Sequence, residues 1–172
     1  HSTSRRQRQM CIRDRYLDCG FIQPSSSPAA ANAFIVKKGD NSYRVVYDYR
    51  KINTYLATQT YLGNTVMDCI QQIAAAKSKH FISLDLFNAF HHLELTERSR
   101  PFTAIQTHLG RYSFSRAPFG IRSIPSALQK CIQYTLMQDM TLIPHITAYL
   151  DDLLLHAATL DELYDLLVRT FK

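Results

Sequence analysis

Two adjacent carboxylates, Asp151 and Asp152, stand inside an otherwise apolar segment with the sequence ITAYLDDLLLH. An unpaired charge in an apolar interior is very costly, so solvent at a hairpin tip, a basic partner or a metal ion must compensate for it. Neighbouring side chains of a straight strand point to opposite faces, whereas a tight hairpin with the pair at its turn presents both at one sheet edge. The pattern predicts two short strands, 146–150 and 153–155, joined at this pair.

A third carboxylate, Asp85, is the next-to-last residue of the alternating segment HFISLDL, in which Ile82, Leu84 and Leu86 share the face opposite to Asp85. If this strand lies beside the Asp151–Asp152 hairpin, three carboxylates meet. Mg²⁺ prefers oxygen ligands, and two such ions about 3.5–4 Å apart can drive phosphoryl transfer. The residues alone leave two simpler interpretations open, a polar turn for the pair and a helix cap for Asp85.

Composition and charge favour an intracellular protein with a polyanionic partner. The chain has 172 residues, 46% of them apolar, and a net charge of +6, which suits one domain or a compact pair of subdomains. A basic balance favours nucleic acid, although membrane-surface and merely basic proteins carry similar charge. No apolar run reaches the ~18 residues of a membrane-spanning helix, and the N-terminus lacks the apolar core of a secretory signal. The four scattered cysteines are expected to be reduced thiols.

The order of predicted elements is typical of an α+β fold. Residues 1–15 are basic and aperiodic, and we expect a disordered or artefactual tail there rather than a basic arm that binds nucleic acid. Strands at 33–38 and 43–47 should form a hairpin with basic residues near its turn. The remaining expected elements are a helix at 64–76 capped by Asn64, a hairpin at Gly110, a helix at 125–139 opened by Pro125, and a helix behind the capping box at Thr159–Glu162.

Five segments, in order, resemble the reverse transcriptases of gypsy-like LTR retrotransposons, and the resemblance covers roughly residues 16–172. The segments are GFIQPSSSP, FIVKKGDNSYRVVYDYRKIN, SLDLFNAFHHLEL, APFGIRSIPSALQK and AYLDD. The resemblance implies a right-hand polymerase in which an antiparallel palm sheet packs on helices. It implies fingers at 16–57 and 93–123 and palm at 58–92 and 124–172, with the thumb and any RNase H domain absent.

The resemblance also implies a role for individual positions. Asp85, Asp151 and Asp152 would be the catalytic triad that binds two Mg²⁺ or Mn²⁺ ions, and the Leu86 carbonyl would add a ligand. Phe90 would exclude a ribose 2′-OH, although outside this motif it reads as an ordinary core aromatic. The incoming dNTP would also meet Lys37, Lys38, Arg44, Asn88, Ala89 and Phe119, and the template and primer would meet Gly120, Tyr149 and Arg50.

The departures from the family pattern affect fine template contacts and leave the triad intact. The family commonly has Asn where this chain has Ser123, and small or polar residues where it has Arg122 and Ile124. The pair His91-His92 also departs from the family pattern, and we interpret it as surface or packing residues. A tandem pair on a helix diverges by about 100°, which does not suit a metal site.

The resemblance implies an RNA-directed DNA polymerase, a nucleotidyltransferase that uses an RNA or DNA template and a DNA or tRNA primer. The thumb and RNase H domains of the same polyprotein would be its partners, without a membrane, in a cytoplasmic particle or the nucleus. Three alternatives stay open: an RNA-dependent RNA polymerase, an inactive retroelement-derived fragment that only binds nucleic acid, and a purely structural protein. Against the RNA polymerase, that class usually carries Gly-Asp-Asp and a polar residue where this chain has Phe90.

Overall fold

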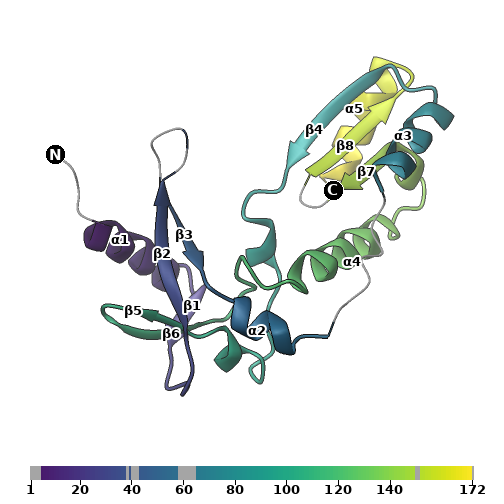
Figure 1. Cartoon of the computed structure of the whole chain (residues 1–172). Coiled ribbons are helices and arrows are strands. Elements are labelled where there is room, and N and C mark those ends of the chain that lie inside the picture. The colour runs from purple at the N-terminus through teal and green to yellow at the C-terminus, as the bar shows by residue number, and fades with distance from the viewer. Residues whose placement is uncertain (1–4, 38, 40–42, 58–64, 150–151, 172) are drawn as a thin grey trace. The chain divides into compact units, whose positions relative to one another are not determined.

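The computed structural model describes residues 5–37, 39, 43–57, 65–149 and 152–171. The chain forms two compact units, each built from two separate stretches of sequence (Figure 1). Unit 1 comprises His1–Ala57 and Phe90–Ile124, and unit 2 comprises Thr58–Ala89 and Pro125–Lys172. Among the described residues, no helix is long and apolar enough to cross a membrane. The four cysteines form no disulfide.

Unit 1 is built on a five-stranded sheet with the order β1-β6-β5-β2-β3. Strand β2 pairs with β5 in parallel, and the other neighbours are antiparallel. The predicted hairpins at 33–47 and at Gly110 are both present in this sheet. The strands are β1 (Ile22–Pro24), β2 (Ala31–Lys37), β3 (Tyr43–Tyr47), β5 (Ile105–Thr107) and β6 (Gly110–Phe114), and the helices are α1 (Arg5–Asp18), α2 (Arg50–Tyr55) and η2 (Arg100–Thr103), with η1 (Ala89–His92) at the junction with unit 2.

Helix α1 corrects the expectation of a disordered tail from residue 5 onward, whereas residues 1–4 lie outside the described residues. The segment from 5 to 18 contains no Gly or Pro and is rich in Arg, which favours helix. Arg13 anchors the helix to the sheet, because its Nη1 donates to the Tyr112 hydroxyl at 3.2 Å. The polar, aperiodic pattern did not predict this helix, because its contact with the sheet joins residues far apart in the sequence.

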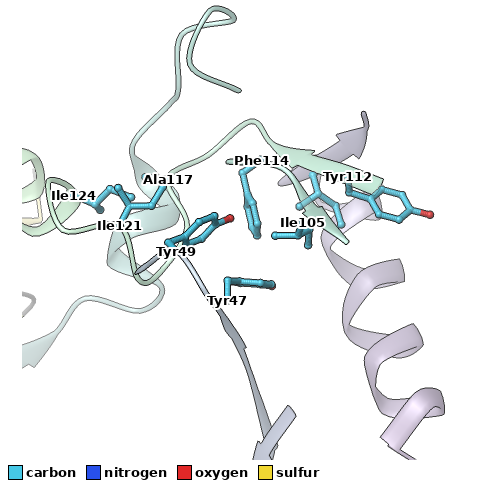
Figure 2. Packing of buried hydrophobic residues seen from close by; sticks show 9 residues of the cluster. Tyr47, Tyr49, Ile105, Tyr112, Phe114, Ala117, Ile121 and Ile124 are labelled. Carbon is cyan, nitrogen blue, oxygen red and sulfur yellow. The ribbon is translucent and has the colours of Figure 1, made fainter. Parts of the chain in front are cut away.

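Aromatic side chains dominate the core of unit 1 (Figure 2). Phe114 is fully buried, and its ring lies 5.2 Å from that of Tyr47 in an edge-to-face arrangement. The Tyr49 hydroxyl donates to the Thr103 carbonyl at 2.8 Å, so its polar end is satisfied inside the core. Burial raises the pKa of both tyrosines. These contacts join the end of β3 and the residues after it to β6 and to η2.

Unit 2 is built on a three-stranded antiparallel sheet with the order β4-β8-β7. One face of the sheet packs Ile82, Leu84 and Leu155 against Leu163 and Leu166 of helix α5. The alternation predicted for β4 is present, because Phe81, Ser83 and Asp85 are exposed and the residues between them are partly buried. The strands are β4 (His80–Asp85), β7 (Ile146–Tyr149) and β8 (Asp152–Ala157), and the helices are α3 (Val66–Ala75), α4 (Ile124–Leu136), η3 (Ile143–His145) and α5 (Leu160–Thr170). With unit 1, this arrangement confirms the α+β class.

Two capping boxes begin helices of unit 2. The predicted box at Thr159 is confirmed, with Glu162 as its reciprocal partner. Helix α3 is capped by Thr65, not by Asn64 as predicted, and Asn64 itself lies outside the described residues. Thr65 takes this place because Asp68 stands three residues later and returns a bond, accepting from the Thr65 N–H at 2.8 Å.

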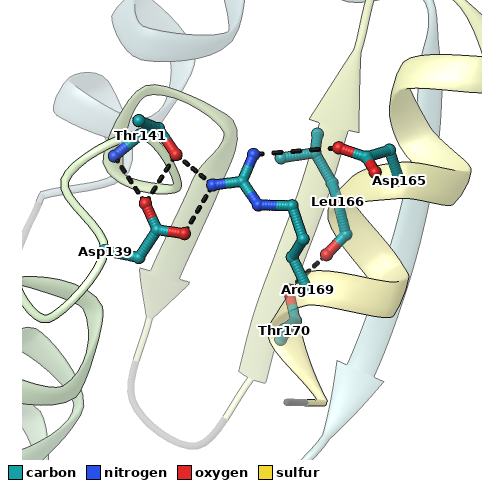
Figure 3. Close-up of polar contacts among 6 residues, drawn as sticks. All are labelled: Asp139, Thr141, Asp165, Leu166, Arg169 and Thr170. Atoms are coloured by element: carbon teal, nitrogen blue, oxygen red, sulfur yellow. Dashed lines mark hydrogen bonds and ion pairs between the residues drawn. The ribbon is translucent and has the colours of Figure 1, made fainter.

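Helix α5 is tied to the turn after α4 by a charged contact (Figure 3). Asp139 accepts hydrogen bonds from the Thr141 hydroxyl and from Arg169 Nη2, each at 2.5 Å. Thr141 and then Arg169 stabilise the carboxylate and lower the pKa of Asp139 to about 2. The contact therefore holds a surface carboxyl ionised well into acid.

A buried histidine, His156, joins three segments of unit 2. Its Nδ1 lies 2.8 Å from the Ser78 hydroxyl and its Nε2 lies 3.2 Å from the Thr147 hydroxyl. Burial, and then the nearby His145, lower the pKa of His156. The neutral ring thus links β8 to β7 and to the turn before β4.

Candidate active site

Three predicted site residues form one row across the end of the unit 2 sheet. Asp152, the first residue of the central strand β8, is directly opposite Asp85 on β4 and directly opposite Tyr149 on β7. Residues directly opposite each other in antiparallel strands point to the same face. All three side chains are exposed. The sheet therefore presents two carboxylates and a phenol together, although Asp85 comes from a distant part of the sequence.

The two carboxylates are held close together without a cation. Directly opposite residues have Cβ atoms about 4.5–5.5 Å apart, and like charges at that separation repel. In the described part of the chain, neither Asp85 nor Asp152 makes an ion pair. Asp151, the third predicted carboxylate, lies outside the described residues, so a group of three acidic ligands is not found among them. Two oxygen donors with no basic partner are ligands suited to a hard divalent cation.

The strands place these carboxylates at the sheet end for local reasons. Alternation along β4 buries Ile82 and Leu84 and so turns Asp85 to the opposite face. The apolar run that follows Asp152 keeps β8 in the centre of the sheet, where Leu155 is fully buried. The charged residues can be tolerated only where the strands end and solvent reaches them.

The turn after β4 contains a hydrogen bond between two backbone groups that were predicted to meet the metal or the nucleotide. The Leu86 carbonyl accepts a hydrogen bond from the Ala89 N–H at 3.1 Å. A carbonyl has two lone pairs, so Leu86 keeps one for a further partner. The Ala89 N–H, which was predicted to face the triphosphate, is already donated within this turn. Asn88 adopts a left-handed conformation (φ 52°), which Asn tolerates better than most residues.

Phe90 and Phe119, both predicted to meet the nucleotide, lie together in unit 1. Their ring centroids are 4.9 Å apart in an edge-to-face arrangement. His91, which is buried, lies 5.5 Å from the Phe119 ring and donates from Nδ1 to the Ala117 carbonyl at 2.9 Å. The packing interpretation thus holds for His91, while His92 is exposed.

Gly120 follows Phe119 in a conformation that favours glycine, with φ 99°. A Cβ atom there would lie 3.4 Å from the Tyr47 carbonyl oxygen, so the main chain approaches the core closely. The Asn53 side chain holds this loop, donating to the Gly120 carbonyl at 2.9 Å and accepting from the Arg122 N–H at 3.0 Å. One side chain, Asn53, therefore holds the loop at two residues, Gly120 and Arg122.

The basic residues predicted for the triphosphate do not share one face. Arg44 is directly opposite Val36 in the β2–β3 hairpin, whereas Lys37 is directly opposite Tyr43. Successive side chains alternate, so Lys37 and Arg44 point to opposite faces. Lys38 lies outside the described residues.

Arg50, predicted to contact the template or primer, forms an ion pair in the structure. Its Nε and Nη2 donate to the two Asp48 carboxylate oxygens at 2.8 and 2.7 Å. The Arg50 guanidinium lowers the pKa of Asp48 to about 2. The Arg50 side chain stays 90% exposed, so the pair leaves it open to a further partner.

The comparison with known families matches residues 35–172 to the model described as "Reverse transcriptase (RNA-dependent DNA polymerase)". The chain belongs to the reverse transcriptase family. Among its curated relatives, the Pol polyprotein of Drosophila melanogaster transposon 297 is 34% identical over 151 residues, which cover 85% of this chain and 14% of that protein. The gypsy Pol polyprotein of the same organism is 33% identical over 144 residues, 79% of this chain and 13% of that protein. The chain is thus a reverse transcriptase segment of LTR retrotransposon type that spans about a seventh of these relatives.

Solved reverse transcriptases share the fold. A prototype foamy virus protease–reverse transcriptase superimposes with a TM-score of 0.84 at 25% identity, over 95% of this chain and 21% of that one. A foamy viral protease–reverse transcriptase in complex with an RNA/DNA hybrid gives 0.83 at 22% identity, over 99% of this chain and 22% of that one. These likenesses support the reverse transcriptase arrangement of strands and helices described above.

Sequence reasoning assigned no role to two residues that organise this reverse transcriptase segment. Asn53 holds the loop at Gly120, and it stands at the end of the quoted segment YDYRKIN, where a polar residue follows an apolar one. Gln129 is only 2% exposed inside helix α4 and donates to the Ala148 carbonyl. The available signal was a glutamine next to Leu128 within the helix predicted at 125–139.

Proposed function

We propose that this chain carries the nucleotidyl-transfer centre of a reverse transcriptase. The primer 3′-OH attacks the α-phosphorus of a bound dNTP, and pyrophosphate leaves. The observation that supports this most directly is the cross-strand pair of Asp85 and Asp152, exposed at the end of an antiparallel sheet in a chain of this family. The proposed template is RNA or DNA, consistent with the duplexes bound by two foamy viral neighbours.

The donor set suits two Mg²⁺ or Mn²⁺ ions. Asp85, Asp151 and Asp152 would hold them, together with the remaining lone pair of the Leu86 carbonyl. Such ions, when bound, activate an attacking hydroxyl and stabilise the leaving oxygen of an in-line phosphoryl transfer. The contribution of the protein is to hold its carboxylates in place before the substrates arrive, so that little reorganisation is needed during the reaction.

The other predicted residues would select and orient the substrates. The Phe90 ring would fill the space of a ribose 2′-OH, and its contact with Phe119 would keep it in place. Arg44, with Lys38, would neutralise the triphosphate. Tyr149 would meet the primer end, and the close-packed loop at Gly120 would meet the templating base pair through shape. A copying enzyme must read its template without preference for one sequence, so backbone and shape contacts are expected.

The two units would then be the fingers, unit 1, and the palm, unit 2. The proposed partners are a DNA or tRNA primer and the thumb and RNase H parts of the same polyprotein, in a cytoplasmic particle or the nucleus. The thumb would clamp the duplex that this segment alone would hold weakly.

The test is dNTP incorporation on an RNA template with a DNA primer, using a polymerase that contains this chain together with its thumb. Asp151→Asn and Asp152→Asn should abolish metal-dependent incorporation and leave the fold intact. Asp161→Asn, an exposed aspartate at the start of α5, is the matched control and should keep full activity. A folded wild-type protein that binds the duplex but incorporates nothing would overturn the proposal in favour of a protein that only binds nucleic acid.

A further inference from the structure

Strand β7, which precedes Asp151 and Asp152 in the sequence, has no strand neighbour on its outer side among the described residues. The described sheet has the order β4-β8-β7, so β8 covers only one edge of β7. Ile146 and Ala148 are both 3% exposed, so water does not reach these two residues. Buried main-chain carbonyls nearly always have a hydrogen-bond partner. The outward carbonyls of β7 therefore need donors from elsewhere.

Two glutamine side chains supply these donors. Gln72 of α3 donates from Nε2 to the Ile143 carbonyl at 2.5 Å and to the Ile146 carbonyl at 3.3 Å. Gln129 of α4 donates from Nε2 to the Ala148 carbonyl at 3.3 Å. Ile146 and Ala148 are two residues apart, and carbonyls at that spacing point to the same side of a strand. Two helices thus do for β7 what an additional strand would do.

The burial of Gln129 indicates that a glutamine stands at this position because its amide donates to the Ala148 carbonyl. The residue is 2% exposed, and its Oε1 is buried with no hydrogen-bond partner within the described residues. A buried polar atom without a partner is unfavourable, so packing alone would favour Leu or Met at this helix position. The donation to Ala148 is the one described contact of the amide that an apolar side chain could not replace.

We propose that Gln129 and Gln72 are positioning residues that fix β7 and thereby the carboxylates of the active site. Ala148 is followed by Tyr149, which is directly opposite Asp152, and Asp152 is directly opposite Asp85. A shift of β7 along or away from β8 would displace this whole row. The inference rests on the proposed function, because exact placement of Asp85 and Asp152 matters only if these carboxylates take part in nucleotidyl transfer.

The first test compares amide hydrogen exchange in β7 between the wild-type chain and glutamine variants, in the absence of substrate. Gln129→Met keeps the length of the side chain and removes the donor, and it should speed exchange of the β7 amides about tenfold, the value of one hydrogen bond. Gln72→Met should act in the same way at the Ile146 end. Gln133→Met, one turn further along α4, and Gln71→Met, the exposed neighbour of Gln72, are the matched controls and should leave β7 unchanged. Exchange in unit 1 should stay the same in all variants.

The second test is kinetic, in the polymerase that contains this chain. Gln129→Met should lower kcat about tenfold, while the KM for dNTP stays within about twofold, because Arg44, Phe90 and Phe119, proposed to meet the dNTP, belong to unit 1. Normal kcat in Gln129→Met, or β7 exchange equal to that of Gln133→Met, would overturn the inference. A wild-type enzyme without incorporation would instead overturn the proposed function, and the exchange comparison would still decide whether the glutamines fix β7. If Gln129→Met fails to fold, Gln72→Met carries both measurements.

Discussion

Neutralising one carboxylate of the cross-strand pair should stabilise the metal-free protein while abolishing its chemistry. Asp85 and Asp152 are directly opposite each other, and neither has a cation partner in the described part of the chain. At a separation of ~5 Å two unit charges repel by roughly 0.8 kcal/mol in water. A Debye length of ~8 Å at physiological salt reduces this by about half. We therefore expect Asp85→Asn to raise the free energy of unfolding by about 0.4–1 kcal/mol, the upper value applying where the sheet partly excludes water.

The measurement is urea denaturation of the chain in EDTA at low, physiological and ~1 M salt. The gain should shrink in ~1 M salt, where the Debye length is about 3 Å. Mg²⁺ should reverse the order of stability, because the proposed ion would bind the folded wild-type protein, whereas the variant has lost one of the proposed ligands. Asp161→Asn is the control, and it should destabilise by a few tenths of a kcal/mol, since an acidic group at a helix N-terminus is favourable.

A destabilised or unchanged Asp85→Asn protein in EDTA would refute this reasoning. That result would mean that the two carboxylates do not face each other across β4 and β8. Natural active sites often keep such unfavourable arrangements at the expense of stability. A stabilised but inactive variant would therefore connect the geometry of the row to its proposed use.

Three further predictions concern substrate choice and pH. Phe90→Ala should raise the relative kcat/KM for ribonucleotides about tenfold or more in single-nucleotide incorporation, because the ring no longer occupies the space of a 2′-OH; unchanged selectivity would contradict this. The pKa of Asp139 is lowered from 3.8 to about 2, so it stabilises the fold above pH ~4 and that stabilisation is lost as pH falls toward 2; Arg169→Met should weaken this dependence in urea denaturation, and an identical pH profile would count against the contact. Burial lowers the pKa of His156 and of His91, so the unfolded chain binds more protons and stability should decline below pH ~6.5. His156→Phe should remove part of that decline in urea denaturation and leave the part due to His91. An unaltered slope would show that His156 does not titrate on unfolding.

Local patterns in the sequence predicted most of the elements. Alternation in the segment HFISLDL placed Asp85 on the exposed face of β4, because a half-buried strand has a period of two. The capping box at Thr159 gave the start of α5 correctly. A second box, Thr65 with Asp68, was present in the sequence as well and would have corrected the choice of Asn64, since only Thr65 has the reciprocal partner three residues later.

The sequence could not give the contacts that depend on register between distant segments. That Asp152 is directly opposite Asp85, and Arg44 on the other face from Lys37, follows from strand pairing, and a slip of one residue would reverse either result. The donation from Gln129 to Ala148 joins a helix to a strand, and no local pattern encodes it. Helix α1 escaped prediction for a related reason, because its anchor, Arg13 on Tyr112, lies far away in the sequence.

The pairing of β4 with β8 has a consequence for the order in which the molecule is made. Phe90–Ile124, which belongs to unit 1, is inserted between Asp85 and Asp152, so β4 emerges from the ribosome long before its partner. Closing so long a loop is slow, and pairing of this kind limits the rate of folding. Until β8 is synthesised, Asp85 has no residue opposite it, and the apolar face of β4 stays uncovered until Leu163 and Leu166 of α5 follow. The carboxylate pair proposed to bind the metal can therefore form only after the chain has been synthesised through Ala157, the last residue of β8.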